Sequence, residues 1–121
     1  MNIPVRFSLL GRTINVIDRA DLIQDRDWVG AADYNKDLIE LLPASPLFVS
    51  SQAKKEQTFC HEFAHHLLYH AGGAINWNMK DGQHVYKNEE FVDLLGSLIQ
   101  QALSTMEYKI PEHVESTILG V

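Results

Sequence analysis

The order of the predicted elements indicates an α+β fold, with a small, mainly antiparallel sheet packed against two long helices. Short segments that mix β-branched and polar residues fill the first third of the chain. Two longer segments with capping residues at their starts follow, and Pro43 and Pro46 interrupt regular structure before them. At 121 residues the chain has the length of one compact domain, which we expect to span residues 1–121.

Four strands are expected before the helices. They are Ile3–Leu10, Thr13–Asp18, Trp28–Tyr34 and Asp37–Leu42. Gly11 and Arg12 offer a tight connection between the first two strands, and Asn35 and Lys36 form a plausible turn between the last two. Residues 19–27 are charged with a few apolar positions, which indicates a short helix or a loop.

The first long helix has recognisable ends. Ser50 or Ser51 can cap its start, and the helix is expected to run to about His70. Gly72 and Gly73 follow, as glycine commonly does at the end of a helix.

The second long helix is expected from Glu89 to about Met106, with Asn88 as its cap. Residues 74–87, between the two helices, contain Gly and several Asn and Asp residues and resemble a loop. The tail at 107–121 is interrupted by Pro111 and is expected to add at most a short last helix.

Composition excludes several classes of protein. A hydrophobic fraction of 45% and a net charge of −6 are typical of a soluble globular protein and disfavour a reader of nucleic-acid backbones. The single cysteine, Cys60, excludes an intrachain disulfide and suits a reducing compartment. With no export signal and no apolar run of the roughly 18 residues that span a bilayer, we expect a cytoplasmic protein without a membrane partner.

The most informative motif is Cys60-His61-Glu62-Phe63-Ala64-His65, which contains H-E-x-x-H inside the first helix. Two imidazoles four residues apart lie on one helix face, separated by about 40° on the helical wheel. They can bind one Zn²⁺ from the same side, while Glu62 can reach water at the metal without being a ligand. His66, His70 and Cys60 point elsewhere on the helix and are expected to have packing or surface roles.

A catalytic zinc ion needs a third protein ligand, which the second helix can supply. Glu89, Asp93, Gly96 and Gln100 lie on one stripe of an otherwise apolar helix. Buried polar side chains need a partner, and a metal site would provide one. Glu89 is the favoured ligand, because Glu90 points about 100° away from this stripe.

Together, the two motifs resemble the gluzincin zinc peptidases, in which H-E-x-x-H is followed by a downstream N-E-x-x-x-D. The small size and the run His61–His70 are more similar to the short ImmA/IrrE-type metallopeptidases of bacteria and their phages. The resemblance covers about Lys54–Gln101. The second helix departs from the ImmA pattern by carrying bulky side chains: Phe91, Val92 and Leu94.

The resemblance implies a minimal zincin-like domain. It further implies that His61, His65 and Glu89 bind Zn²⁺, that Glu62 is the general base, and that Asp93 holds a ligating histidine in place. The implied activity is hydrolysis of peptide bonds in a protein substrate. The alternative is a non-catalytic zinc-binding module with a regulatory or accessory role in a mobile element such as a phage.

Such a peptidase also needs a side chain that stabilises negative charge on the substrate carbonyl. The candidates are Tyr86, His84, Tyr34 and Tyr108, and position in a loop favours His84 or Tyr86. An extended peptide substrate is expected to add to the strand edge nearest the metal helix, for which we favour Asp37–Leu42.

Overall fold

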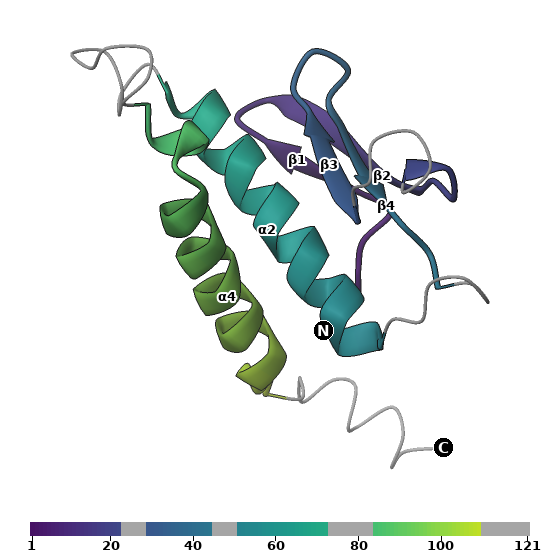
Figure 1. The fold of residues 1–121 in the computed structure, drawn as a ribbon. Coiled ribbons are helices and arrows are strands. Elements are labelled where there is room, and N and C mark those ends of the chain that lie inside the picture. The colour runs from purple at the N-terminus through teal and green to yellow at the C-terminus, as the bar shows by residue number, and fades with distance from the viewer. Residues whose placement is uncertain (23–28, 45–50, 73–83, 110–121) are drawn as a thin grey trace, which may run out of the picture.

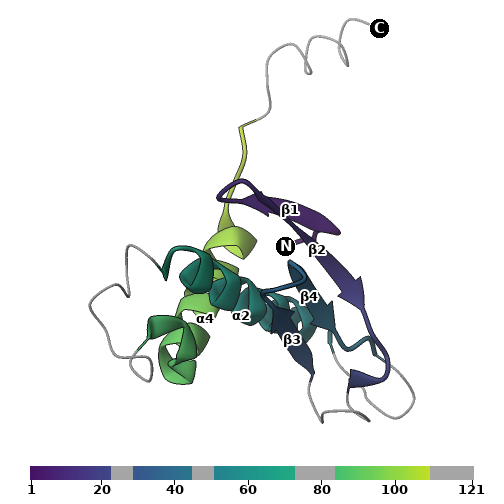
Figure 2. The ribbon, with the colours of Figure 1, turned by 90° about the horizontal axis from the view of Figure 1, so that it is seen from above.

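The computed structural model describes residues 1–22, 29–44, 51–72 and 84–109. In these residues the chain forms a small α+β fold, as expected (Figure 1). Helix α2 (Gln52–His70) packs on a four-stranded sheet, and helix α4 (Glu89–Thr105) packs against α2. Figure 2 shows α2 between the sheet and α4. Parts of the segments expected at 19–27, 74–87 and 107–121 lie outside the described residues.

The sheet is mixed, with the strand order β1-β2-β4-β3. Its strands are β1 (Arg6–Leu9), β2 (Arg12–Asp18), β3 (Gly30–Asp33) and β4 (Leu38–Leu41). The pairs β1–β2 and β3–β4 are antiparallel, in line with the expected mainly antiparallel sheet. The pair β2–β4 is parallel, which joins the two hairpins into one sheet.

The two hairpin connections differ by a residue from those expected. Leu10 (φ 51°) and Gly11 (φ 78°) form the first turn, and Arg12 already pairs with Leu9 in the sheet. Asp37 (φ 51°) belongs to the second turn, so the expectation that β4 begins at this residue is wrong. The Arg12 guanidinium holds Asp37 in place, with Nε 2.8 Å from Oδ1.

The position of β4 corrects a second expectation. This strand lies between β2 and β3, so both of its edges are paired, and Asp37–Leu42 cannot accept an added strand. The edge strands of the described sheet are β1 and β3, and β3 contacts α2. Within the described sheet, the edge beside α2 is therefore that of β3.

Both long helices begin where their capping residues predict. The Ser51 hydroxyl accepts a hydrogen bond from the Lys54 amide at 3.1 Å, which selects Ser51 over Ser50 as the cap of α2. The Asn88 side chain accepts one from the Phe91 amide at 3.0 Å at the start of α4. Helix α2 ends at His70 and α4 at Thr105. One turn of 3-10 helix, η2 (Val85–Lys87), replaces part of the expected loop.

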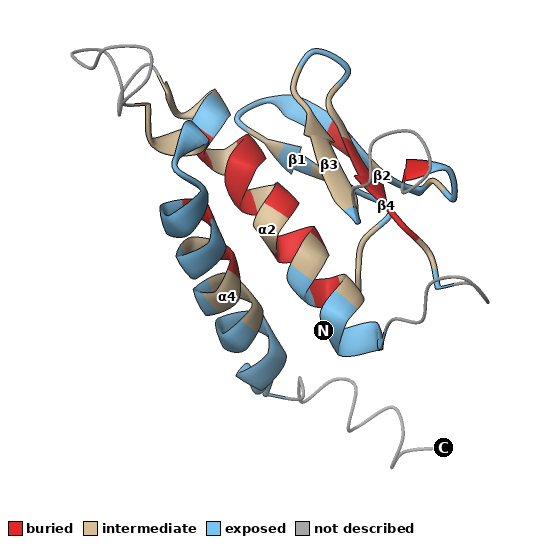
Figure 3. Cartoon of the chain, in the orientation of Figure 1, coloured by how far each residue is buried: buried red, intermediate tan, exposed pale blue. Residues whose placement is uncertain are grey.

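Two apolar clusters of buried residues lie on opposite sides of α2, and Figure 3 shows buried residues along much of this helix. The cluster between the sheet and α2 consists of Ile14, Ile39, Leu41, Phe59 and Cys60. The cluster between α2 and α4 consists of Ala64, Leu68 and Val92. Cys60 is thus a packing residue, as expected, and burial raises the pKa of its thiol to about 11. Among the described residues, no helix is long and apolar enough to cross a membrane.

Candidate metal centre

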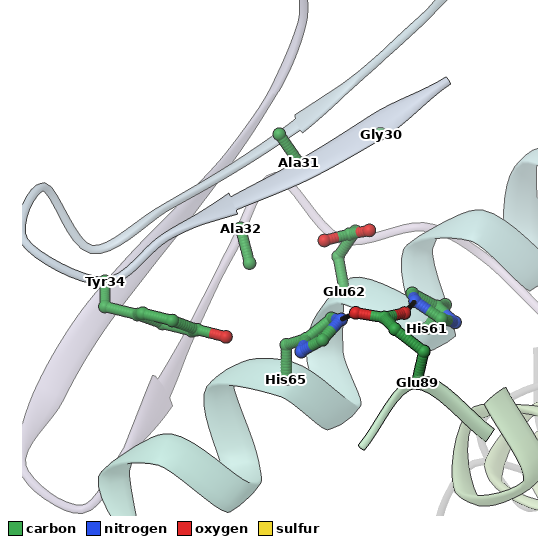
Figure 4. Close-up of a pocket in the computed structure, with 8 residues that line it drawn as sticks. All are labelled: Gly30, Ala31, Ala32, Tyr34, His61, Glu62, His65 and Glu89. Atoms are coloured by element: carbon green, nitrogen blue, oxygen red, sulfur yellow. Dashed lines mark hydrogen bonds and ion pairs between the residues drawn. The ribbon is translucent and has the colours of Figure 1, made fainter. Parts of the chain in front are cut away.

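Three side chains predicted to bind metal meet at the interface of α2 and α4. His61 and His65 come from the middle of α2, and Glu89 is the first residue of α4. The Nε2 atom of His61 lies 3.1 Å from one carboxylate oxygen of Glu89, and the Nε2 atom of His65 lies 3.1 Å from the other (Figure 4). All three ligand atoms lie within 4.8 Å of one another. The helical spacing of H-E-x-x-H and the return of the chain through η2 produce this convergence.

The orientation of His65 is set by the backbone of η2. Its Nδ1 atom lies 2.9 Å from the carbonyl oxygen of Tyr86, which can only accept a hydrogen bond. Nδ1 therefore carries the proton, and in the neutral ring Nε2 presents its lone pair toward Glu89. Burial lowers the pKa of His65 and so favours the neutral ring. A lone pair and a carboxylate oxygen that face each other at 3.1 Å repel unless a cation lies between them.

The other ring nitrogen of His61 faces a carboxylate. Its Nδ1 atom lies 3.4 Å from Oδ1 of Asp93, one helical turn after Glu89. This is the contact expected of Asp93, and a proton on Nδ1 leaves Nε2 as the ligand atom. Glu89, rather than Glu90, is the residue that contacts both histidines.

Small and polar residues bring α4 close to α2. A Cβ atom on Gly96 would lie only 2.9 Å from the Cα atom of His61, so the two helix backbones approach each other at this candidate ligand. Farther along α4, the Gln100 side chain donates a hydrogen bond to the carbonyl of Ala53 at 2.9 Å. The polar stripe predicted on α4 therefore faces α2. It is not buried as expected, because the side chains of Glu89 and Asp93 are 67% and 66% exposed.

Glu62 lies in a pocket beside the three candidate ligands. The pocket has a volume of about 410 Å³ and is lined by Gly30, Ala31, Ala32, Tyr34, His61, Glu62, His65 and Glu89. Burial raises the pKa of Glu62 to about 7, so this carboxyl group can take up and release a proton near neutral pH. Figure 4 shows its side chain between the edge strand β3 and the two histidines.

Among the four candidates for stabilising carbonyl charge, Tyr34 lines this pocket. Tyr86 contributes its carbonyl oxygen to His65, and its ring packs against Tyr34 with 5.8 Å between ring centroids. The His84 ring packs in turn on Tyr86, and Tyr108 is 79% exposed beyond the end of α4. Position in the sequence favours Tyr86 and His84 instead. Tyr34 reaches the pocket because the β3–β4 hairpin packs on α2, and the sequence does not indicate this packing.

The remaining histidines of α2 point away from the candidate ligands, as expected. His66 is fully buried, and its Nε2 atom donates a hydrogen bond to the carbonyl of Leu38 at 2.9 Å. Its Nδ1 atom lies 3.3 Å from Nε2 of His70. These two side chains connect α2 to the start of β4.

Comparisons with known protein families, with curated proteins and with solved structures find no match for this chain. Its chemistry is therefore inferred from its own residues. Two imidazoles and one carboxylate, with unshared electron pairs converging, form a donor set that suits a divalent ion of borderline softness such as Zn²⁺.

Proposed function

We propose that this chain is a zinc-dependent peptidase with a zincin-like domain, which resembles the gluzincins and the small ImmA/IrrE-type enzymes in its motifs. The observation that carries the proposal is the contact of both histidine Nε2 atoms with the carboxylate of Glu89, at 3.1 Å each. Three protein ligands that leave room for water are typical of catalytic zinc. A purely structural site has no use for an acidic residue between its two histidines.

The residues present would hold zinc through His61, His65 and Glu89, with Asp93 and the Tyr86 carbonyl orienting the two imidazoles. When bound, zinc supplies a Lewis acid that makes water a nucleophile near neutral pH and polarises the substrate carbonyl.

Glu62 would act as the general base. It accepts a proton from the attacking water as the new carbon–oxygen bond forms. It then donates this proton to the amide nitrogen as the carbon–nitrogen bond breaks and the amine leaves. Its place in the pocket with the candidate ligands, and a pKa that burial raises to about 7, both suit a group that takes up and returns a proton in each turnover.

A peptide substrate would add to the edge of β3. Among the described residues, this strand pairs only with β4, and residues 30–32 line the pocket beside Glu62. Their small side chains, Gly-Ala-Ala, leave space for an extended chain whose backbone amides and carbonyls pair with those of β3. Such pairing recognises a backbone, which supports a protein or peptide as the substrate.

The substitution Glu62→Gln tests this function. The variant and the wild-type protein are loaded with zinc and incubated with a peptide library prepared from a digested proteome, and new termini are detected by mass spectrometry. We expect equal zinc binding by the two proteins, cleavage by the wild type, and a loss of cleavage of at least about 100-fold in Glu62→Gln. Cleavage by the variant at the wild-type rate would refute the mechanism. Zinc binding without cleavage by either protein would instead support a non-catalytic zinc-binding module.

A further inference from the structure

We infer that Tyr34 is a further catalytic residue, whose hydroxyl donates a hydrogen bond to the oxygen of the peptide carbonyl under attack. This inference rests on the proposed peptidase function and assigns the donor that such a reaction needs. Three features of the structure support this role: the position of the hydroxyl, the packing around the ring, and the absence of a hydrogen-bond partner for the hydroxyl among the described residues.

The hydroxyl lies in the same pocket as the base and the ligands. Tyr34 directly follows edge strand β3 and lines the pocket together with Glu62 and His65. Figure 4 shows its ring lying along the pocket, with the hydroxyl pointing toward His65. A substrate strand paired to β3 would thus run past this hydroxyl and the candidate metal ligands together.

The ring is held by other aromatic side chains. Tyr69 stacks on Tyr34 with 4.1 Å between centroids and an angle of 2° between the rings. His66 and Tyr86 contact the ring at their edges, at centroid distances of 5.3 and 5.8 Å. A donor positioned by packing before substrate arrives loses little further freedom when the transition state forms.

The hydroxyl has no hydrogen-bond partner in the part of the chain that the structure describes, although the residue is half-buried. Tyrosine hydroxyls removed from solvent normally find a partner, so this one is available to a ligand in the pocket. Burial, assisted by the nearby charge of Glu62, raises the pKa of Tyr34, which keeps the phenol protonated and able to donate.

Binding of an anionic probe tests the inference without relying on turnover. A short N-phosphorylated peptide carries a tetrahedral anion that resembles the charge formed during attack on a peptide bond. Its dissociation constant is measured by calorimetry with zinc-loaded wild-type protein and with Tyr34→Phe, which keeps the ring and removes only the hydroxyl. We expect Tyr34→Phe to weaken binding about 10- to 100-fold, as for loss of a hydrogen bond to a charged group. On a cleaved library peptide, kcat should fall about 100-fold with little change in KM.

The matched control is Tyr69→Phe, which removes the hydroxyl of the tyrosine stacked on Tyr34 and keeps its ring. This variant should bind the probe as the wild type does, within about twofold. Unchanged probe affinity and kcat in Tyr34→Phe would overturn the inference. If Glu62→Gln is inactive in the same experiment, the proposed function stands without Tyr34. A wild-type protein that binds neither zinc nor the probe would overturn both.

Discussion

Gly96 of α4 lies directly against the backbone of His61 in α2. A Cβ atom on Gly96 would lie 2.9 Å from the Cα atom of His61 and 3.0 Å from its amide nitrogen. Backbone atoms cannot rotate away as a side chain can, so any larger residue at position 96 must separate the two helices. The distance between the histidines of α2 and Glu89 of α4 therefore depends on this glycine.

We predict that Gly96→Ala weakens zinc binding and lowers the stability of the protein. Alanine favours the helix by about 1 kcal/mol relative to glycine. Overpacking at a backbone contact costs about 1–3 kcal/mol, so the free energy of unfolding should fall on balance. Urea unfolding and zinc calorimetry measure the two effects. The exposed residue Gln101 provides the control, because Gln101→Ala changes α4 away from this contact. Gly96→Ala with wild-type zinc affinity would mean that the helix spacing does not determine the site.

A second close contact joins β3 to α2 beside the base. A Cβ atom on Gly30 would lie 2.5 Å from Cγ2 of Thr58 and 3.4 Å from Cγ of Glu62. We predict that Gly30→Ala displaces the edge strand, lowers the melting temperature and reduces peptide cleavage.

The double variant Gly30→Ala/Thr58→Ser should recover most of the melting temperature and most of the peptide cleavage that Gly30→Ala loses. Serine removes the methyl group that collides with the new Cβ and keeps the hydroxyl that donates to the carbonyl of Lys54 at 3.0 Å. Thr58→Ser alone is the matched control. If the double variant is no better than Gly30→Ala, the defect has another origin than this contact.

The sequence predicted the candidate ligands because they depend on local structure. Helical periodicity places His61 and His65 on one face, and the capping residues Ser51 and Asn88 define where the two helices begin. Once α2 and α4 pack side by side, the first turn of α4 reaches the middle of α2. The prediction needed one contact between distant segments, which is the packing of α4 on α2. The polar stripe of α4, which ends in Gln100, indicated this contact.

The sheet around the site was less predictable, because it depends on pairing between distant segments. The parallel pairing of β2 with β4 leaves β3 at the edge, and the alternation of side chains within each strand does not encode which strand is outermost. The role of β3 as the edge and the position of Tyr34 in the pocket both follow from that order. The 3-10 turn that brings the Tyr86 carbonyl to His65 was likewise not indicated by composition.

Acidification should destabilise the protein through His66. Burial lowers the pKa of this residue from its usual 6.5 in the folded state, and the charges of His70, Asp37 and His65 also act on it. The unfolded chain then binds the proton more readily, so stability is complete above pH 6.5 and is lost as the pH falls below that value.

The slope from this one group is at most about 1.4 kcal/mol per pH unit. Urea unfolding between pH 7.5 and pH 5.5, in the presence of a chelator, should show a smaller loss of stability for His66→Gln, whose amide can still donate to the carbonyl of Leu38. Titrating groups that do not interact with His66 contribute equally to the two proteins. Parallel stability curves for the wild type and the variant would contradict this prediction.

The most direct test of the central claim is a zinc titration of the wild type, Glu89→Gln and Glu90→Gln. Both substitutions remove an acidic residue from the first turn of α4, so they alter the helix dipole and the net charge alike. We predict one zinc ion per wild-type chain and an unchanged affinity in Glu90→Gln. Glu89→Gln should lose more than the roughly 10- to 100-fold in affinity that removal of a supporting residue costs. Equal zinc affinities for the two variants, or no zinc bound by the wild type, would contradict the account.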